Sequence, residues 1–484
     1  MYNSDIKKNY LYNVFYQILA IIVPIVTTPY ISRALGVTGV GKYNYVYAIV
    51  YIFSLFCWMG TNIYGQKEIA YCGDNIEDRS KVFFEICIIK IIAFLFSSII
   101  YIITIIFIHE DIQLFIFAYF YLLANFVDIS WLYQGIEDFR STVLRNSIVK
   151  IAGLILVFIF VKSQNDVWMY MFILAFTAFA GQLFMWLGVH RLINGVDIRK
   201  LNFRRHIKPA IVLFLPSIAT YVYTSLDKVM LGAIANADEV GVYSQSEKII
   251  KLAMTIVTSL GIVMIPRMAA LVKMQNWEKI EANLNKAFQF VFFLSIPMIA
   301  GMIAISDVFI PWFLGDGFER CILLFQTLSP LILIIGIASI TGQAVLVPLN
   351  KQSYYTVTVV SGAAINCILN LILIPQFAAF GATFATLFAE GSVTVLQLIG
   401  IRSYFNHKAF IASLLKYTIC SFIMYAIVKF IDMMLLFQDS FLQLGIDVLV
   451  GIVSYLFILV ILRDTLLFEL FKKMLSFVSR IVHN

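Results

Sequence analysis

The feature of this sequence that most constrains its fold is a series of apolar runs, each about 20 residues long, that fills most of the 484 residues. A helix of that length crosses the hydrocarbon core of a bilayer and satisfies its own backbone hydrogen bonds there. Only 13% of the residues are charged, about half the usual share, which excludes a soluble enzyme, a nucleic-acid-binding protein and a secreted scaffold. We therefore predict an all-α polytopic membrane protein. The apolar runs predict about fourteen transmembrane helices, at 10–32, 43–64, 83–108, 113–134, 147–161, 168–189, 209–233, 242–266, 287–312, 321–347, 353–374, 380–401, 413–436 and 443–462.

The distribution of basic residues predicts how the chain is oriented. If the N-terminus is cytoplasmic, the loops and tails on that side hold 24 Lys and Arg, and the loops on the opposite side hold four. Short basic loops stay in the cytoplasm, so we expect both termini to be cytoplasmic. The loops on the outer side are short and no GxxxxGK[ST] phosphate-binding loop occurs. The function is therefore expected to lie within the membrane rather than in an appended domain.

A motif that occurs twice predicts an internal repeat. The pattern LG…VGxY begins at Leu35, between the first two predicted spans, and again at Leu231, between the seventh and eighth. Six spans separate the copies, so both halves would enter the membrane in the same direction, as in transporters built from parallel repeats. We predict two pseudo-symmetric six-helix lobes at 1–208 and 209–402, followed by two further helices and an amphipathic tail at 403–484. The alternative is a chance match of a few residues.

Prolines are expected to break the first helix of each lobe. Pro24 and Pro29 lie in the first span and Pro216 in the seventh. Proline removes a backbone hydrogen bond, and broken helices at corresponding places of two repeats are typical of a transporter's binding site. The alternative is a static packing kink.

Ionisable residues within predicted spans form one dense group, which consists of Asp227, Lys228, Glu247, Lys248 and Lys251. Lys228 and Glu247 are equally far from the turn between their helices, and Glu247 and Lys251 have the i,i+4 spacing of a helical ion pair. Charges in a bilayer need partners or a wet cavity. The excess of lysines favours a cavity that receives an anionic group, and the alternative is a salt-bridge network that locks a lobe.

Further charged residues lie within or next to the predicted spans. Lys90 and Asp128 lie at similar depth across a hairpin and are expected to form a structural pair, and Glu85 has the i,i+4 spacing of an ion pair with Lys81. Glu390 lies about ten residues from either end of its span. It is expected to be either a protonatable group that couples transport to an ion gradient or a neutral acid that bonds to a neighbour. The five histidines fall in predicted loops or tails, so neither a metal site nor a buried proton relay is expected.

Several short segments along the chain carry a resemblance to a known family. They are IYGQKEIA at 63–70, WLYQGIE at 131–137 leading to RN at 145–146, LDKVMLG at 226–232, GVY at 241–243 followed by EK at 247–248, and PR at 266–267. These segments resemble those of Wzx-type polysaccharide repeat-unit flippases, in the same order and over nearly the whole chain. This family is part of the superfamily that also contains multidrug and toxin extruders and lipid II flippases.

The resemblance implies a multi-pass protein of the bacterial inner or plasma membrane, whose two lobes form a V-shaped central cavity. It would move an oligosaccharide repeat unit on undecaprenyl diphosphate from the cytoplasmic to the outer leaflet by alternating access, for O-antigen, capsule or exopolysaccharide synthesis. The last two spans would help to form a groove for the lipid tail. Arg33, Lys228, Lys248 and Lys251 would contact diphosphate or acidic sugars, oriented by Asp227 and Glu247.

On this resemblance the protein has no catalytic residues and no cofactor, with coupling to a proton or sodium gradient left open. Its partners would be the bilayer, the lipid-linked oligosaccharide, a polysaccharide polymerase and a chain-length regulator, but no nucleic acid. The alternatives are a lipid II flippase, a small-molecule antiporter of the multidrug extruder type, and a membrane polymerase or acyltransferase.

Overall fold

The structure is a computed structural model that describes residues 2–108, 110–434 and 440–482. These residues form helices joined by short turns, with no strand among them, and twelve helical segments are long and apolar enough to cross a membrane. The all-α multi-pass fold is therefore confirmed. The twelve correspond to the fourteen predicted spans because the first two spans merge into one segment and the seventh, α8 (Arg204–Ile234), is not counted among them.

The chain forms two compact units, Met1–Gly241 and Val242–Asn484, which are described separately. In the first unit, α1 packs against α3, α4, α6 and α8, and α4 packs closely along α7. Its helices are α1 (Tyr2–Trp58), α2 (Thr61–Cys72), α3 (Ile76–Phe107), α4 (Ile112–Val127), α5 (Ser130–Gly135), α6 (Phe139–Phe160), α7 (Val167–Trp186) and α8 (Arg204–Ile234), with short 3₁₀ turns η1 (Gln164–Asp166), η2 (Val189–Arg191) and η3 (Ile198–Lys200).

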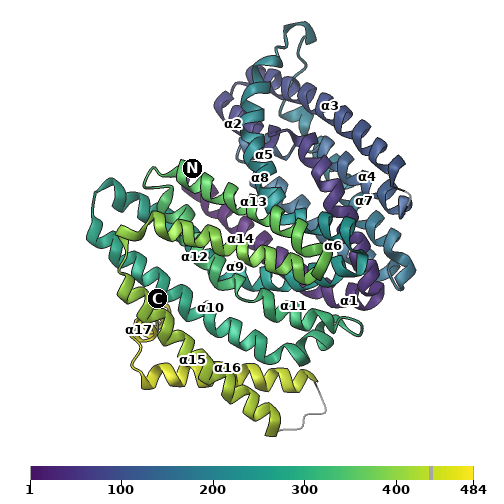
Figure 1. The fold of residues 1–484 in the computed structure, drawn as a ribbon. Coiled ribbons are helices and arrows are strands. Elements are labelled where there is room, and N and C mark those ends of the chain that lie inside the picture. The colour runs from purple at the N-terminus through teal and green to yellow at the C-terminus, as the bar shows by residue number, and fades with distance from the viewer. Residues whose placement is uncertain (1, 109, 435–439, 483–484) are drawn as a thin grey trace. The chain divides into compact units, whose positions relative to one another are not determined.

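In the second unit, α10, α15 and α16 lie side by side, and α13 and α14 form a tight hairpin (Figure 1). Its helices are α9 (Ala237–Lys273), which starts at the end of the first unit, α10 (Trp277–Leu314), α11 (Arg320–Leu328), α12 (Leu331–Ser339), the π-helix η4 (Ile340–Leu346), α13 (Gln352–Phe377), α14 (Ala379–Gly400), the 3₁₀ turn η5 (Arg402–Tyr404), α15 (His407–Met434), α16 (Ser440–Ile461) and α17 (Thr465–Val482). The predicted domain boundaries at 208 and 402 stay predictions.

The break in the first helix lies at a glycine rather than at the prolines. The helix assignment runs through Pro24 and Pro29 to Trp58, and its one non-helical residue is Gly36, with φ of 65°. That region of the backbone map suits glycine, because a side chain there meets the following carbonyl oxygen. The predicted loop between the first two spans is thus a single-residue kink, and α8 carries its helix assignment through the position of Pro216.

The repeated VG motif has a direct structural role. A Cβ atom added to Gly41 would lie 1.7 Å from the carbonyl oxygen of Ala237, and one added to Gly241 would lie 2.3 Å from the carbonyl oxygen of Val37. The two contacts are equivalent, because the glycine of each copy of the motif meets a carbonyl oxygen at the same position of the other copy. Glycine is required at both places because the helix backbones touch, which explains why this part of the motif recurs.

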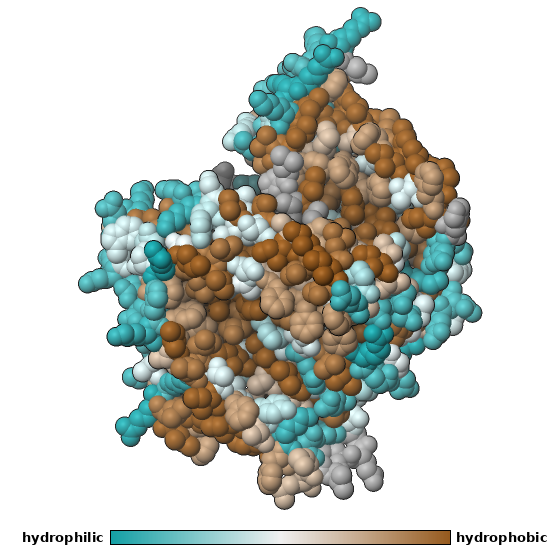
Figure 2. Space-filling model, in the orientation of Figure 1, coloured by the Kyte–Doolittle hydropathy of each residue, from teal (hydrophilic) through white to brown (hydrophobic). Residues whose placement is uncertain are grey.

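Large apolar side chains point outward along the helices, as expected of a surface that faces lipid rather than water. Ile99 on α3 is 59% exposed, and Leu449 on α16 is 64% exposed. On the face of the second unit drawn in Figure 2, hydrophobic residues cover the helix sides and hydrophilic residues gather toward the helix ends.

The predicted amphipathic tail is helical, and its start is anchored. In α17, the backbone N–H of Leu467 donates to Asp464 Oδ1 at 2.8 Å, so Asp464 caps the helix. The side chains of Lys416 and Tyr417 on α15 also bond to Asp464. Lys416 therefore forms an ion pair with this buried carboxylate.

Candidate functional site

The five residues of the predicted cationic group divide between the two units. Asp227 is buried and Lys228 half-buried on α8, in the first unit. Glu247 is buried and Lys248 half-buried on α9, in the second unit, and Lys251 Nζ lies 2.6 Å from Glu247 Oε1. The i,i+4 ion pair is confirmed. The approach of Lys228 to Glu247 and the anion-binding role of the lysines stay predictions.

The other predicted positions are scattered. Arg33 is exposed on α1, three residues before the kink at Gly36, and Glu390 is half-buried in the middle of α14. Lys90 and Asp128 meet as expected, but the Lys90 ammonium donates to the main-chain carbonyl of Asp128. The Asp128 carboxylate instead accepts from the backbone N–H of Ser130 at 2.8 Å. This contact therefore holds the end of α4 in place rather than forming an ion pair.

A polar pocket of about 270 Å³ lies inside the first unit, between α1, α4, α6 and α7. It combines aromatic rings with amide groups and two basic side chains. Arg145 is 9% exposed and Lys150 is half-buried. The lining residues are Tyr47, Val50, Tyr51, Ser54, Trp58, Tyr121, Ala124, Asn125, Arg145, Asn146, Val149, Lys150, Ala178 and Gln182.

The tyrosines of this pocket belong to a connected aromatic cluster. The ring of Tyr47 meets Tyr121 edge-on at 5.1 Å, and Tyr51 stacks on Tyr221 at 4.8 Å. Tyr43 bonds to the Tyr121 hydroxyl at 3.2 Å. Aromatic faces pack against apolar C–H groups while phenol oxygens form hydrogen bonds, and Arg binds phosphate in a bidentate fork. Such a pocket can hold a sugar ring beside an anionic group.

This pocket is not among the sites predicted from the sequence, although the sequence carries a signal for it. Tyr43, Tyr47 and Tyr51 follow one another at intervals of four residues. That spacing places all three on one face of a helix. Arg145 belongs to one of the segments that carry the family resemblance, but it is not among the predicted binding residues.

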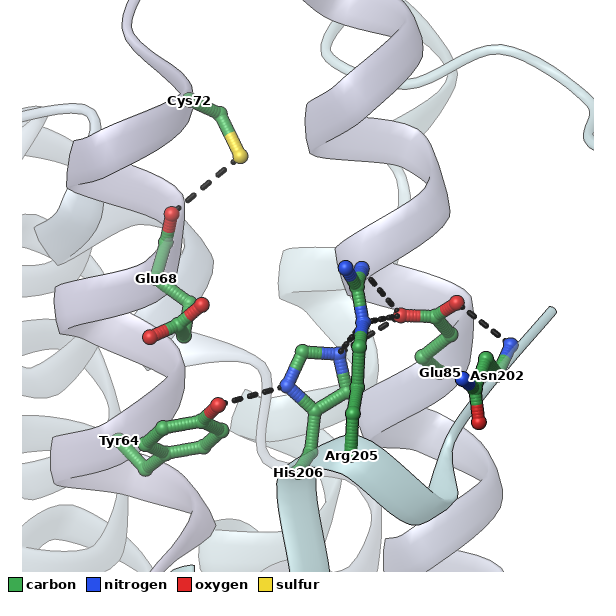
Figure 3. Close-up of polar contacts among 7 residues, drawn as sticks. All are labelled: Tyr64, Glu68, Cys72, Glu85, Asn202, Arg205 and His206. Carbon is green, nitrogen blue, oxygen red and sulfur yellow. Dashed lines mark hydrogen bonds and ion pairs between the residues drawn. The ribbon is translucent and has the colours of Figure 1, made fainter. Parts of the chain in front are cut away.

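A second polar cluster joins α2, α3 and α8 (Figure 3). Glu85 on α3 is fully buried and accepts hydrogen bonds from the Asn202 backbone N–H at 2.7 Å and from Arg205 Nη2 at 2.6 Å. His206 is 1% exposed, and its two ring nitrogens lie 2.7 Å from Glu85 Oε2 and 2.7 Å from the Tyr64 hydroxyl.

This cluster corrects two predictions. The partners of Glu85 are Arg205 and His206 rather than Lys81, and one histidine is buried among titratable groups rather than lying in a loop or tail. The sequence did not show this because Glu85 and His206 are 121 residues apart. A buried carboxylate needs several donors, and here these contacts tie the start of α8 to α2 and α3.

An apolar pocket of about 470 Å³ lies in the second unit, between α9, α10, α15 and α16, and we call it the apolar groove. Its wall contains one ionisable carboxylate, that of Asp447. The lining residues are Ile249, Ala253, Phe293, Leu294, Pro297, Met298, Gly301, Met302, Ile305, Phe309, Phe325, Met424, Val428, Asp447, Val448, Gly451, Ile452, Tyr455 and Leu456.

Comparison with known proteins settles the family. The family described as "Polysaccharide biosynthesis protein" matches residues 6–272, more than half of the chain. The chain belongs to this family. A protein of Shigella dysenteriae named "Putative O-antigen transporter" is 24% identical over 400 residues, which cover 82% of this chain and all of that protein. A protein of the same name from Escherichia coli K12 is 21% identical, over 82% of this chain and 97% of that protein.

The family assignment agrees with the fold. A structure of the lipid II flippase MurJ in an inward closed conformation has a TM-score of 0.75 at 16% identity, and covers 94% of this chain and 99% of that chain. An inward-facing multidrug resistance MATE family transporter of the MOP superfamily has a TM-score of 0.57 at 12% identity, over 79% and 97% of the two chains. The family match and the two O-antigen transporter relatives confirm the resemblance to Wzx-type flippases, and the likeness in fold agrees with it.

Proposed function

We propose that this protein is a flippase for oligosaccharide repeat units linked to undecaprenyl diphosphate, and that it moves them from the cytoplasmic to the outer leaflet for surface polysaccharide synthesis. The observation that supports this most strongly is that the chain offers two pockets of opposite chemistry. One is lined by tyrosines, amides and basic groups, and the other is almost wholly apolar. A lipid-linked oligosaccharide has the same two chemistries in one molecule.

The tyrosine-lined pocket of the first unit would receive sugar and phosphate groups. Tyr47, Tyr51 and Tyr121 present ring faces and hydroxyls, and Arg145 and Lys150 supply positive charge. Arg33, Lys228, Lys248 and Lys251 remain candidates for further contacts with diphosphate or acidic sugars. A charged head group cannot cross hydrocarbon unaided, so these groups would replace the water it loses.

The apolar groove of the second unit would hold part of the polyprenyl tail. Its walls come from α15 and α16, which are the last two predicted spans, together with α9 and α10. Burial of hydrocarbon stabilises a complex by roughly 25 cal/mol per Å² of apolar area removed from water, but a tail moving from lipid to groove gains mainly close packing. The groove therefore guides the tail rather than supplying high affinity.

The basic loops indicate how the protein is oriented in its membrane. We infer that the protein lies in the bacterial inner or plasma membrane with both termini in the cytoplasm. Translocation changes no covalent bond, so we assign no catalytic residue. A polymerase and a chain-length regulator would act on the product at the outer face.

Complementation of a deletion strain tests this function. Loss of the protein should abolish surface polymer and leave lipid-linked repeat units on the cytoplasmic side. Arg145→Gln, and separately the double replacement Lys248→Gln with Lys251→Gln, should reduce polymer at least tenfold while the protein level stays normal. The exposed Lys279 on α10 offers a matched control, because Lys279→Gln should restore polymer fully. Normal polymer in both test variants would exclude these basic groups from substrate handling.

A rival function within the superfamily is separable in the same strain. If the protein translocates lipid II, its depletion stops cell-wall synthesis and growth. A repeat-unit flippase is instead expected to be dispensable when the first sugar transfer of the repeat unit is also blocked.

A further inference from the structure

A buried acid in the apolar groove has no role in holding a hydrocarbon tail. We propose that the apolar groove also binds a lipid-like amphiphile that carries an ammonium group, with the ammonium held by Asp447 and the alkyl chain along α10, α15 and α16. This goes beyond the proposed flippase function, since a polyprenyl tail carries no positive charge.

Asp447 lies in the second turn of α16, where its side chain helps to line the groove. It is only 3% exposed, and its Oδ1 atom has no hydrogen-bond partner in the described part of the chain. A buried polar atom without a partner costs about 1–3 kcal/mol, and more when it carries charge. An occupant that donates a hydrogen bond to Oδ1 would remove that cost.

The charges near Asp447 favour a cation as the occupant. Asp432 and Lys429 on α15 both act electrostatically on Asp447. Lys429 Nζ lies 3.1 Å from Asp307 Oδ2 on α10 and 3.9 Å from Asp432 Oδ2, and the Gln443 amide donates to Asp432. Among the described residues at this end of the groove, three carboxylates thus face one ammonium group, so the site can accept a further positive charge.

The shape of the site selects among cations. No described group of acidic, histidine or cysteine side chains here converges closely enough to hold a metal ion. The cavity of about 470 Å³ is of the size that accepts small organic molecules, and its remaining walls are apolar, with three methionines, Met298, Met302 and Met424. A compact positive charge on an alkyl chain fits this arrangement, because the charge can bind the Asp447 carboxylate while the chain packs against the apolar walls.

On the predicted topology, the end of α15 and the start of α16 face the outside, so the acidic end of the groove lies toward the head groups of the outer leaflet. An amphiphile in that leaflet could enter with its ammonium already at the level of Asp447. The groove would then hold such a molecule whenever it does not hold a polyprenyl tail.

The test compares two probes of equal chain length, dodecylamine and dodecanol, on the purified full-length protein in a nonionic detergent. A ligand that binds only the folded protein raises its stability with concentration, so thermal unfolding at a series of probe concentrations gives an apparent affinity. We expect dodecylamine to bind roughly tenfold more tightly than dodecanol, as for a charge-assisted hydrogen bond. Asp447→Asn should make the two affinities equal. The exposed Asp74 of the first unit gives a matched control, because Asp74→Asn should keep the preference.

A second variant tests the role of the groove while it keeps the Asp447 carboxylate. A Cβ at Gly451 would meet its nearest neighbours, Val428 and Met424, at ordinary contact distances of 3.6 and 3.9 Å, so Gly451→Leu should fold and fill the groove. It should weaken both probes. Equal affinity of amine and alcohol in the natural protein, or an unchanged preference in Asp447→Asn, would overturn the proposal. So would undiminished binding in Gly451→Leu. Loss of polymer in the deletion strain bears only on the flippase function, so the two proposals can fail separately.

Discussion

Replacement of Glu85 by glutamine should destabilise the first unit strongly. The change removes the negative charge that accepts from Asn202, Arg205 and His206 at 2.6 to 3.0 Å, and it places an NH₂ group among donors. Loss of one partner of a buried ion pair costs about 3–5 kcal/mol. The Arg205 side chain is 48% exposed and can regain water, so we expect a loss of about 2–3 kcal/mol in the free energy of unfolding.

The free energy of unfolding can be measured in mixed micelles with a thiol-reactive dye, in protein whose other five cysteines are replaced by alanine. The remaining Cys57 lies in the same unit and is fully buried, so it reacts only after that unit opens. Tyr64→Phe removes one hydrogen bond from His206 and should cost about 1 kcal/mol. Lys81→Gln is the decisive control, since Lys81 is the partner that the spacing suggested, and the structure predicts a change below about 0.5 kcal/mol. If Lys81→Gln costs as much as Glu85→Gln, or if Glu85→Gln costs less than about 0.5 kcal/mol, the cluster does not stabilise the fold.

Two further predictions concern stability. Gly41→Ala would place a Cβ 1.7 Å from the Ala237 carbonyl oxygen, and this overpacking should lower the free energy of unfolding by about 2 kcal/mol or more. Gly391→Ala is the control, because open space surrounds this position and the change should be neutral or slightly stabilising. Equal effects of the two changes would refute the close backbone contact. Burial raises the pKa of Asp464, but hydrogen bonds from Lys416, the Leu467 backbone and Tyr417 together hold it below its usual value of 3.8. Its stabilisation of α17 is therefore complete above about pH 4 and is lost as the pH falls through the lowered pKa. Limited proteolysis of α17 should show Asp464→Asn to be more sensitive than the natural protein at pH 7 and equally sensitive near pH 2, and equal sensitivity at pH 7 would contradict the capping role.

The membrane-spanning helices could be predicted from the sequence because a bilayer imposes a simple rule of length and polarity on each of them separately. Where backbone geometry decides, the sequence was less informative. Pro24 and Pro29 suggested a break, but the kink lies at Gly36, where a positive φ is needed. The recurring VG pair was visible as a repeat, and only the structure shows that Gly41 and Gly241 recur because helices touch there.

The polar sites depend on contacts between distant segments, and that is why they were predicted poorly. Spacing along one helix correctly paired Glu247 with Lys251, but the same rule wrongly paired Glu85 with Lys81. A fully buried carboxylate needs donors at both of its oxygens, and here they come from Asn202 and from Arg205 at the start of α8. The tyrosines of the first-unit pocket were each visible, but their convergence with Arg145 requires four helices to be placed together.

Transport of the lipid-linked sugar by the purified protein tests the central claim most directly. Proteoliposomes would be prepared with undecaprenyl-diphosphate-linked oligosaccharide in both leaflets, and the sugar exposed outside would be removed by an added glycosidase. If the protein is a flippase, the lipid-linked sugar of the inner leaflet should become accessible to the glycosidase over time in proteoliposomes and should stay protected in protein-free liposomes. With Arg145→Gln, the inner pool should become accessible much more slowly. An inner pool that stays as protected with the natural protein as without it would contradict the account.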